Sequence, residues 1–155
     1  MNRRNPVNMT FEPVGVVNNE FERKPPGGWE EVVSQVVIDD RWTPALEGLE
    51  GFSHIIVLFW LNRAREGILL HVHPQGRQDM PAVGLFATRT PMRPNPIGLR
   101  VVRLVSKEAN VLNVRGLDAF NGSPVLDVKP YLPRGDCVTQ TRIPAWLERL
   151  WGEDG

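Results

Sequence analysis

The stretch LRVVRLVSKEANVLNVRGL, residues 99–117, decides the fold class of this chain. Two runs rich in β-branched and other apolar residues, 99–105 and 111–117, flank the polar segment 106–110. Two such runs with a short polar connection are typical of a β-hairpin. We therefore predict two antiparallel strands joined by a turn within 106–110.

The two strands of this hairpin differ in their side-chain pattern. In the second strand, Leu112 and Val114 alternate with Asn113 and Arg115, as expected for a strand with one face in water. In the first strand, the residues that share one side are Leu99, Val101, Arg103 and Val105. The hairpin is thus predicted to have one half-solvated face.

Short apolar runs recur on both sides of the hairpin, and the strands that they predict are 32–38, 55–61, 68–72, 83–88 and 125–128. The run IIVLFWL, residues 55–61, is almost wholly apolar, so we expect burial on both of its faces. The best helical signal is IPAWLERLW, 143–151, where Pro144 suits a first turn. Many short strands punctuated by 14 Gly and 14 Pro indicate an all-β barrel or sandwich with a short C-terminal helix.

Composition limits the class of protein. The length of 155 residues favours one domain, and 18 basic side chains balance 18 acidic ones. This balance argues against non-specific nucleic-acid binding but permits a local basic patch. Cys137 is the only cysteine, so neither an internal disulfide nor a cysteine-rich zinc site is expected. The chain shows no signal-peptide pattern and no apolar run of about 18 residues, so we expect a cytoplasmic protein with no membrane partner.

Common catalytic and cofactor motifs are missing from the sequence. No glycine-rich dinucleotide loop, phosphate loop or HExxH motif occurs. His71 and His73 would share one side of a strand, but further ligands are not evident, so no metal site is predicted. Ser53 and His54 lie outside any nucleophile elbow, and a turn before a buried strand explains them.

The segment GLFATRTPMRPNPIGLR, residues 84–100, combines two arginines with three prolines. A residue before proline is pushed toward extended conformations, so the segment is predicted to be a stiff loop and not a helix. Arg89 and Arg93 are planar donors suited to a carboxylate or a phosphate. On physical grounds alone, a ligand-binding loop and a simple strand exit are equally supported.

Two further segments attract attention. In LDAFNGSPVLDVKPYLP, residues 117–133, Asn121-Gly122 is a strong turn signal, and Asp118, Asp127, Lys129 and Tyr131 lie around it. An ordinary hairpin turn is the alternative. The segment NNEFERKPPGGW, residues 18–29, is polar and long for a connection, which is typical of a functional or a mobile loop.

Together and in this order, VGVV, LEGFSHIIVLFWL, GLFATRTPMRPNPIGLRVVRL and NGSPVLDVKPYLP resemble the TsaA-like (YaeB-like) family. Its members are S-adenosylmethionine-dependent methyltransferases that act on threonylcarbamoyladenosine in transfer RNA. The resemblance implies a small β-barrel of mostly antiparallel strands, S-adenosylmethionine as cofactor, transfer RNA as partner, and a homodimer with the cofactor near the interface. It also implies a flexible N-terminus at 1–10, a single domain at 11–150 and a tail at 151–155.

The resemblance transfers site residues to this chain. The implied cofactor-binding residues are Lys24, Pro25, Pro26, Asn62, Arg63, Arg89, Leu99, Asp118, Asn121, Gly122, Ser123 and Pro124. Those that shape the loop or meet the substrate are Arg93, Asn95 and Lys129. Arg89 or Arg63 would pair with the cofactor's carboxylate. Asp118 and Asp127 are the carboxylates that could take a proton from the acceptor, and Tyr131 could hydrogen-bond to or stack on a base.

This chain departs from the family pattern at several positions. It has Asn121-Gly122-Ser123-Pro124 where Asp-Gly-Thr-Pro is common, and Asn62-Arg63 where a histidine-containing pair is common. Longer members carry a C-terminal extension beyond this point. Two alternatives to the tRNA methyltransferase therefore stay open: a barrel that binds the cofactor or a nucleotide without turnover, and a methyltransferase for a small molecule or a protein.

Overall fold

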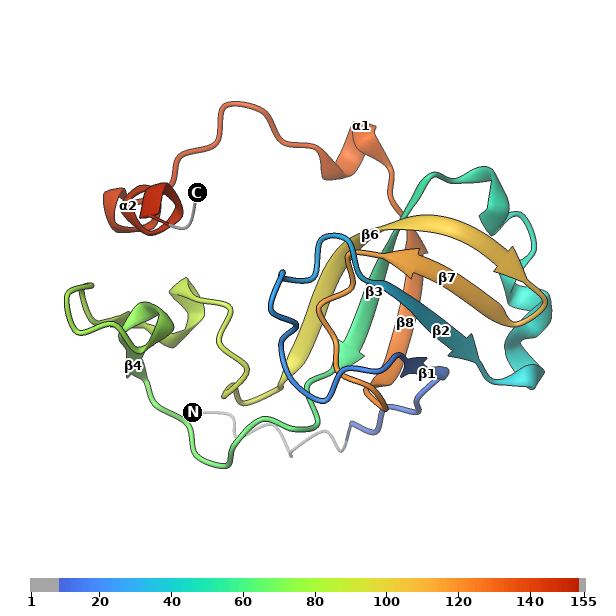
Figure 1. The fold of residues 1–155 in the computed structure, drawn as a ribbon, viewed down its shortest axis with the longest axis horizontal. Helices are drawn as coiled ribbons and strands as arrows, with labels where there is room; N and C mark the ends of the chain where they lie inside the picture. The colour runs from blue at the N-terminus through green and yellow to red at the C-terminus, as the bar shows by residue number, and fades with distance from the viewer. Residues whose placement is uncertain (1–8, 154–155) are drawn as a thin grey trace, which may run out of the picture. The chain divides into compact units, whose positions relative to one another are not determined.

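A computed structural model describes residues 9–153, which divide into two compact units. The barrel unit comprises residues 9–62 and 97–131, and the second unit comprises 63–96 and 132–153. Most of the predicted flexible N-terminus and the last two residues of the predicted tail lie outside the described residues. The elements in Figure 1 are β1 (Gly15–Asn18), β2 (Val33–Ile38), β3 (His54–Trp60), β4 (His71–Val72), β5 (Val83–Gly84), β6 (Ile97–Glu108), β7 (Val111–Arg115), β8 (Pro124–Pro130), α1 (Pro133–Asp136) and α2 (Ala145–Glu153).

The barrel unit is a closed antiparallel barrel with the strand order β1-β2-β7-β6-β3-β8 (Figure 1). Each neighbouring pair, including the closing pair β1 and β8, is antiparallel. Closure removes the exposed edges that an open sheet would present for aggregation. The predicted all-β barrel and the predicted hairpin, which is β6 and β7, are both confirmed.

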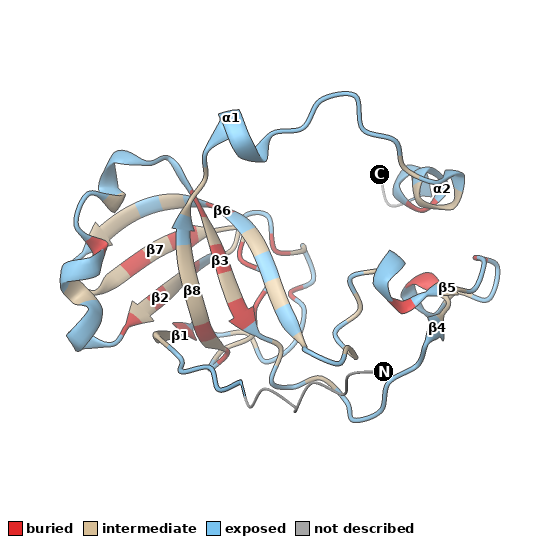
Figure 2. Ribbon diagram, turned by 180° about the vertical axis from the view of Figure 1, so that it is seen from behind, coloured by how far each residue is buried: buried red, intermediate tan, exposed pale blue. Residues whose placement is uncertain are grey.

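Alternation along the strands gives the barrel one apolar interior (Figure 2). In β7, Leu112 and Val114 are fully buried, which confirms the predicted alternation. In β3, Val57 and Phe59 point into the core while Trp60 is exposed, so the prediction that 55–61 is buried on both faces was wrong. A small closed barrel has only one interior, and the alternate side chains must face outward.

The apolar side of β6 is the outer side. Leu99, Val101 and Val105 are exposed, whereas Val102 is buried in the core. The register between β6 and β7 shifts between Leu104 and Ser106, as in a β-bulge. The sequence pattern therefore identified a shared face correctly but did not reveal that this face lies outside the barrel.

The second unit contains little regular structure. Its strands β4 and β5 have two residues each, shorter than the predicted 68–72 and 83–88. The reason at 83–88 is a 3₁₀ turn at Leu85–Ala87, which the Thr88 backbone amide and hydroxyl close on the Leu85 carbonyl. The predicted C-terminal helix is confirmed as α2, which begins one residue after Pro144. Within the described residues, no helix combines the length and apolarity needed to cross a membrane.

Candidate functional site

The predicted site residues are divided between the two units. The second unit holds Arg63, Arg89, Arg93 and Asn95, and the barrel unit holds Lys24, Pro25, Pro26, Asn62, Leu99, Asp118, Asn121, Gly122, Ser123, Pro124, Asp127, Lys129 and Tyr131.

In the barrel unit, the turn 118–124 and the loop 18–29 lie against each other although about 100 residues of sequence separate them. The backbone amide of Asn121 donates to the Phe21 carbonyl at 2.8 Å, and that of Gly122 donates to the Val17 carbonyl at 2.8 Å. The Asn19 side chain donates to the Ala119 carbonyl at 3.0 Å. Backbone pairing at both ends fixes the relative position of the two segments.

Aromatic packing braces the same pair of segments. The Trp29 ring lies 5.7 Å from Phe21 and 5.9 Å from Phe120, measured between ring centroids. Before Trp29, the amide of Gly28 donates to the Pro25 carbonyl and closes a turn. Pro25 is buried by this turn, while its neighbours Lys24 and Pro26 remain exposed. The loop therefore offers Lys24 to a ligand from a rigid support.

The turn itself has space for a ligand beside its backbone. Gly122 has φ +80°, and a Cβ at this position would meet no atom within 4 Å. The neighbouring Ser123 is buried, and the Asn121 side chain accepts from the Asn19 amide and donates to Glu22 at 3.4 Å. Exposed glycine backbone with adjacent amide and carboxylate groups suits the polar parts of a nucleoside.

Other predicted residues of the barrel unit lie on its strands or next to their ends. Leu99 and Asp127 are the register partners of Leu58 on its two sides. Lys129 contacts the Asp127 carboxylate at 2.7 Å. Tyr131 follows β8, and its amide donates to the His54 carbonyl. Asp118, at the start of the turn, lies 3.9 Å from Arg100.

The proline-rich loop of the second unit is organised by Arg93. Its guanidinium donates to the carbonyls of Thr88 at 2.8 Å and Thr90 at 3.3 Å. It also lies over the Phe86 ring, 5.7 Å from the centroid. Arg89, in contrast, is exposed and has no hydrogen bond or ion pair among the described residues. Within the loop, Arg93 has a structural role and Arg89 is available to a ligand.

The histidines and the serine that the sequence singled out form no further site. The ring of His73 donates to the Met80 carbonyl at 2.8 Å, and His71 lies in β4. No group of three or more metal-ligating side chains occurs within residues 9–153. Ser53 lies 2.9 Å from the His54 ring in an exposed turn. Two residues that the sequence analysis did not single out contact predicted site residues: Glu22 accepts from Asn121, and Phe86 lies against Arg93. The only sequence signals for them were their places in the two unusual loops.

The fold is that of a small closed antiparallel β-barrel whose exposed glycine turn is braced by a long N-terminal loop. The chain belongs to the family of the tRNA-methyltransferase O N-terminal domain, whose model matches residues 18–137. This confirms the resemblance drawn from the motifs, and it makes the chain a member of a methyltransferase family.

Relatives and solved structures agree with this assignment. The chain is 42% identical over 136 residues to an S-adenosyl-L-methionine-binding protein of Archaeoglobus fulgidus, covering 85% of this chain and 96% of the relative. It is 34% identical over 135 residues to the tRNA (adenine(37)-N6)-methyltransferase of Escherichia coli, covering 79% and 57%. A crystal structure of TrmO from Pseudomonas aeruginosa matches with a TM-score of 0.70 and 33% identity, covering 88% of this chain and 62% of that one. The chain thus spans less than two thirds of that solved structure.

Proposed function

We propose that this chain is an S-adenosylmethionine-dependent methyltransferase that modifies transfer RNA. The observation that carries the proposal is the family match over residues 18–137, which includes the loop 18–29, the proline-rich loop and the turn 118–124. The Archaeoglobus and Escherichia relatives, named for cofactor binding and for tRNA adenine methylation, support the same function. The finer proposal is that the acceptor is N6 of threonylcarbamoyladenosine at tRNA position 37.

In the barrel unit, cofactor binding is assigned to the exposed turn 118–124. In the second unit, the family resemblance assigns it to Arg89. When bound, S-adenosylmethionine supplies a methyl group already activated by its sulfonium. The open backbone beside Gly122 lets an adenosine approach closely, and Asn121 offers an amide to it. Arg89 provides a planar cation for the carboxylate of the methionine part.

Methyl transfer to a nitrogen requires that the methyl donor and the acceptor be aligned, and the nitrogen must lose a proton during the reaction. Alignment of donor and acceptor can supply about 7–11 kcal/mol of the barrier, which suits loops braced by proline and by aromatic packing. Asp118 and Asp127 are the two carboxylates assigned to proton removal. Asp118 is favoured because it belongs to the turn assigned to the cofactor; both carboxylates have a cationic neighbour, Arg100 at 3.9 Å for Asp118 and Lys129 at 2.7 Å for Asp127.

The proposal also includes a homodimer that brings the outer face of β6 to a second copy. Leu99, Val101 and Val105 are exposed on this strand, with the exposed Arg103 between the two valines, and Trp60 is exposed on the neighbouring β3. Neighbouring exposed apolar side chains are typical of an interaction site. Leu99 belongs both to this face and to the residues implied for cofactor binding, which matches a cofactor placed near the dimer interface.

Two measurements test the proposal. Titration calorimetry with S-adenosylmethionine tests binding, and absence of heat at millimolar cofactor would refute the enzyme. Incubation with methyl-labelled cofactor and tRNA, followed by nucleoside mass spectrometry, tests turnover. Label on tRNA that carries threonylcarbamoyladenosine, but not on tRNA from cells lacking that modification, is the expected result. Binding without label in any tRNA would leave the non-catalytic barrel as the better description.

A further inference from the structure

Phe86 is an aromatic side chain that the fold of the second unit leaves in solvent. It is 78% exposed, whereas its neighbour Leu85 is 4% exposed and anchors the same turn. A single exposed apolar side chain is common on protein surfaces, so the case for a ligand depends on what surrounds the ring.

The backbone around Phe86 is fixed on both sides. The Leu85 amide donates to the Leu70 carbonyl at 2.9 Å, and the Thr88 amide donates to the Leu85 carbonyl at 3.1 Å. The Thr88 hydroxyl donates to the same carbonyl at 2.8 Å. A ring carried on such a turn loses little conformational entropy when a ligand stacks on it.

Arg93 holds a flat cation against the ring. Two backbone carbonyls accept from its guanidinium, and the guanidinium carbon lies 5.7 Å from the Phe86 centroid. The two side chains form a stacked pair in which the aromatic ring keeps most of its surface in water. The energy of such cation–π contacts rises when a ligand excludes water from them.

The charge around the pair suits a polyanion. In the second unit, no Asp or Glu occurs in the sequence between Asp79 and the end of the proline-rich loop at Pro96. Arg77 is compensated by Asp79 and Glu153, but Arg93 lies in no ion pair with a residue that the structure describes. The positive charge of Arg93 is therefore available to attract a phosphate backbone.

We propose that Phe86, supported by Arg93, is a stacking platform for an unpaired base of the RNA substrate. The inference rests on the proposed function and extends it by naming where the acceptor strand is held. Single-stranded RNA loops are recognised by stacking of splayed bases on aromatic rings and guanidinium planes. In this role Phe86 is a positioning residue. Its ring can stack on any purine or pyrimidine, so the contact does not depend on the identity of the base.

The test uses an anticodon stem-loop RNA with 2-aminopurine in place of the loop adenine, since stacking quenches its fluorescence. The variants are Phe86→Tyr, which keeps an aromatic ring, and Phe86→Leu and Phe86→Met, which keep apolar bulk without one. We expect quenching with the wild type and the tyrosine variant, and none with the other two. RNA affinity should fall about 5- to 100-fold for the leucine and methionine variants, given the usual contribution of one stacked base.

Trp151→Leu is the matched control, because Trp151 is another exposed aromatic residue of the second unit and has no guanidinium against it in any described contact. This control and all Phe86 variants should keep the wild-type affinity for S-adenosylmethionine. Full quenching and affinity in the leucine variant would overturn the inference. So would unchanged RNA binding together with a loss of dimer in the Phe86 variants, which would make Phe86 a protein contact.

Failure of the proposed function gives a different pattern. In that case the wild-type protein binds no S-adenosylmethionine or labels no tRNA, whatever residue stands at position 86. The 2-aminopurine signal does not need turnover, so it decides the stacking role in both cases. Wild-type protein that leaves the probe unquenched at saturation contradicts the platform directly.

Discussion

At the scale of single residues, the turn 118–124 places an amide, Asn121, against the Glu22 carboxylate. The distance between the amide nitrogen and the Glu22 oxygen is 3.4 Å. Asn121→Asp would put two carboxylates in contact, and we expect a loss of about 0.2–1 kcal/mol in the free energy of unfolding at pH 7. Glu22→Gln in the same chain should restore it. Urea unfolding of both single variants and the double variant measures this coupling.

The same pair tests how the cofactor site distributes its negative charge. The family pattern commonly has an aspartate at position 121. If the Glu22 carboxylate replaces that aspartate in the cofactor site, Glu22→Gln alone should weaken S-adenosylmethionine binding in calorimetry. The double variant should regain most of the affinity, because one carboxylate is again present. Equal affinities in all four proteins would show that neither side chain contacts the cofactor.

The two arginines of the proline-rich loop are predicted to respond differently to removal. Arg89→Ala should weaken cofactor binding much more than it lowers stability, because Arg89 is exposed and makes no described contact within the protein. Arg93→Ala deletes two hydrogen bonds to carbonyls and the contact with Phe86, so it should lower the melting temperature. Thermal unfolding and calorimetry separate the two effects. Equal losses of both properties on Arg89→Ala would assign that residue a structural role.

At the scale of elements, the Phe59 ring packs directly against Gly98 at the start of β6. These residues are register partners, and a Cβ at Gly98 would lie 2.5 Å from the ring of Phe59, which is 2% exposed. Gly98→Ala must displace a core ring, so we expect a loss of about 1–3 kcal/mol in the free energy of unfolding. Gly51→Ala is the control, since a Cβ there meets nothing within 4 Å. Similar urea midpoints for the two variants would contradict this account.

Strand positions were predictable from local pattern, but the inner and outer faces of β6 were not. Alternation identified β7 because Asn113 and Arg115 mark the outer side between Leu112 and Val114. In β6 both sides carry valine or leucine, so the alternation does not show which side faces the barrel interior. Only the pairing of β6 with β3 and β7 places Val102 inside the barrel.

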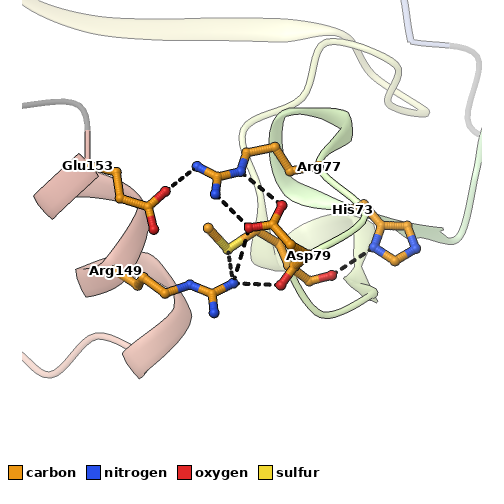
Figure 3. A network of polar contacts seen from close by, with 6 residues as sticks. His73, Arg77, Asp79, Arg149 and Glu153 are labelled. Carbon is orange, nitrogen blue, oxygen red and sulfur yellow. Dashed lines mark hydrogen bonds and ion pairs between the residues drawn. The ribbon is translucent and has the colours of Figure 1, made fainter.

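Helix α2 is attached to the segment before β5 by a network of charges (Figure 3). Arg77 pairs with Asp79 at 2.6 Å and with Glu153 at 2.5 Å, and Arg149 donates to the Asp79 carbonyl. The hydrogen bond from Arg77 holds the pKa of Asp79 below its ordinary value. Folding therefore favours the ionised form, and this stabilisation is present at neutral pH and disappears as the pH falls below about 4.

Asp79→Asn removes the negative charge of this carboxylate. At neutral pH it should therefore weaken the attachment of α2, just as protonation by acid does in the wild type. Hydrogen exchange of the α2 amides is the measurement, and faster exchange is expected for the variant, with a smaller difference at high salt because the pairs are exposed and screened. Glu148→Gln on the same helix is the control, as it lies in no ion pair of the described residues. Unchanged exchange in Asp79→Asn would mean that the remaining contacts of α2, which are the Arg77–Glu153 pair, the bond from Arg149 to the carbonyl of residue 79 and the burial of Leu150, suffice to hold the helix.

At the scale of the whole molecule, the candidate site depends on contacts between distant parts of the sequence. The amide of Asn19 bonds to the side chain of Asn121, 102 residues away, and Arg149 bonds to the backbone of Asp79, 70 residues away. Local pattern marks each loop as unusual through its prolines, glycines and polar residues. Local pattern does not say which loops contact each other. The sequence therefore indicated Lys24 and Asn121 separately and gave no signal for Glu22, whose carboxylate accepts from Asn121.

The predicted single domain at 11–150 stays a prediction beside the two compact units.

The outer face of β6 is proposed to join two copies of the chain. If this face joins two copies, Val101→Glu places a charge in the centre of an apolar interface, where charged residues are depleted. We expect a monomer in size-exclusion chromatography with light scattering, and weaker cofactor binding because Leu99 lies on the same face. Val33→Glu is the matched control, because Val33 is also an exposed valine and lies on β2, which does not pair with β6. A wild-type monomer at low micromolar concentration, or a dimer that survives Val101→Glu, would remove this face from the interface and leave Leu99 to act within one chain.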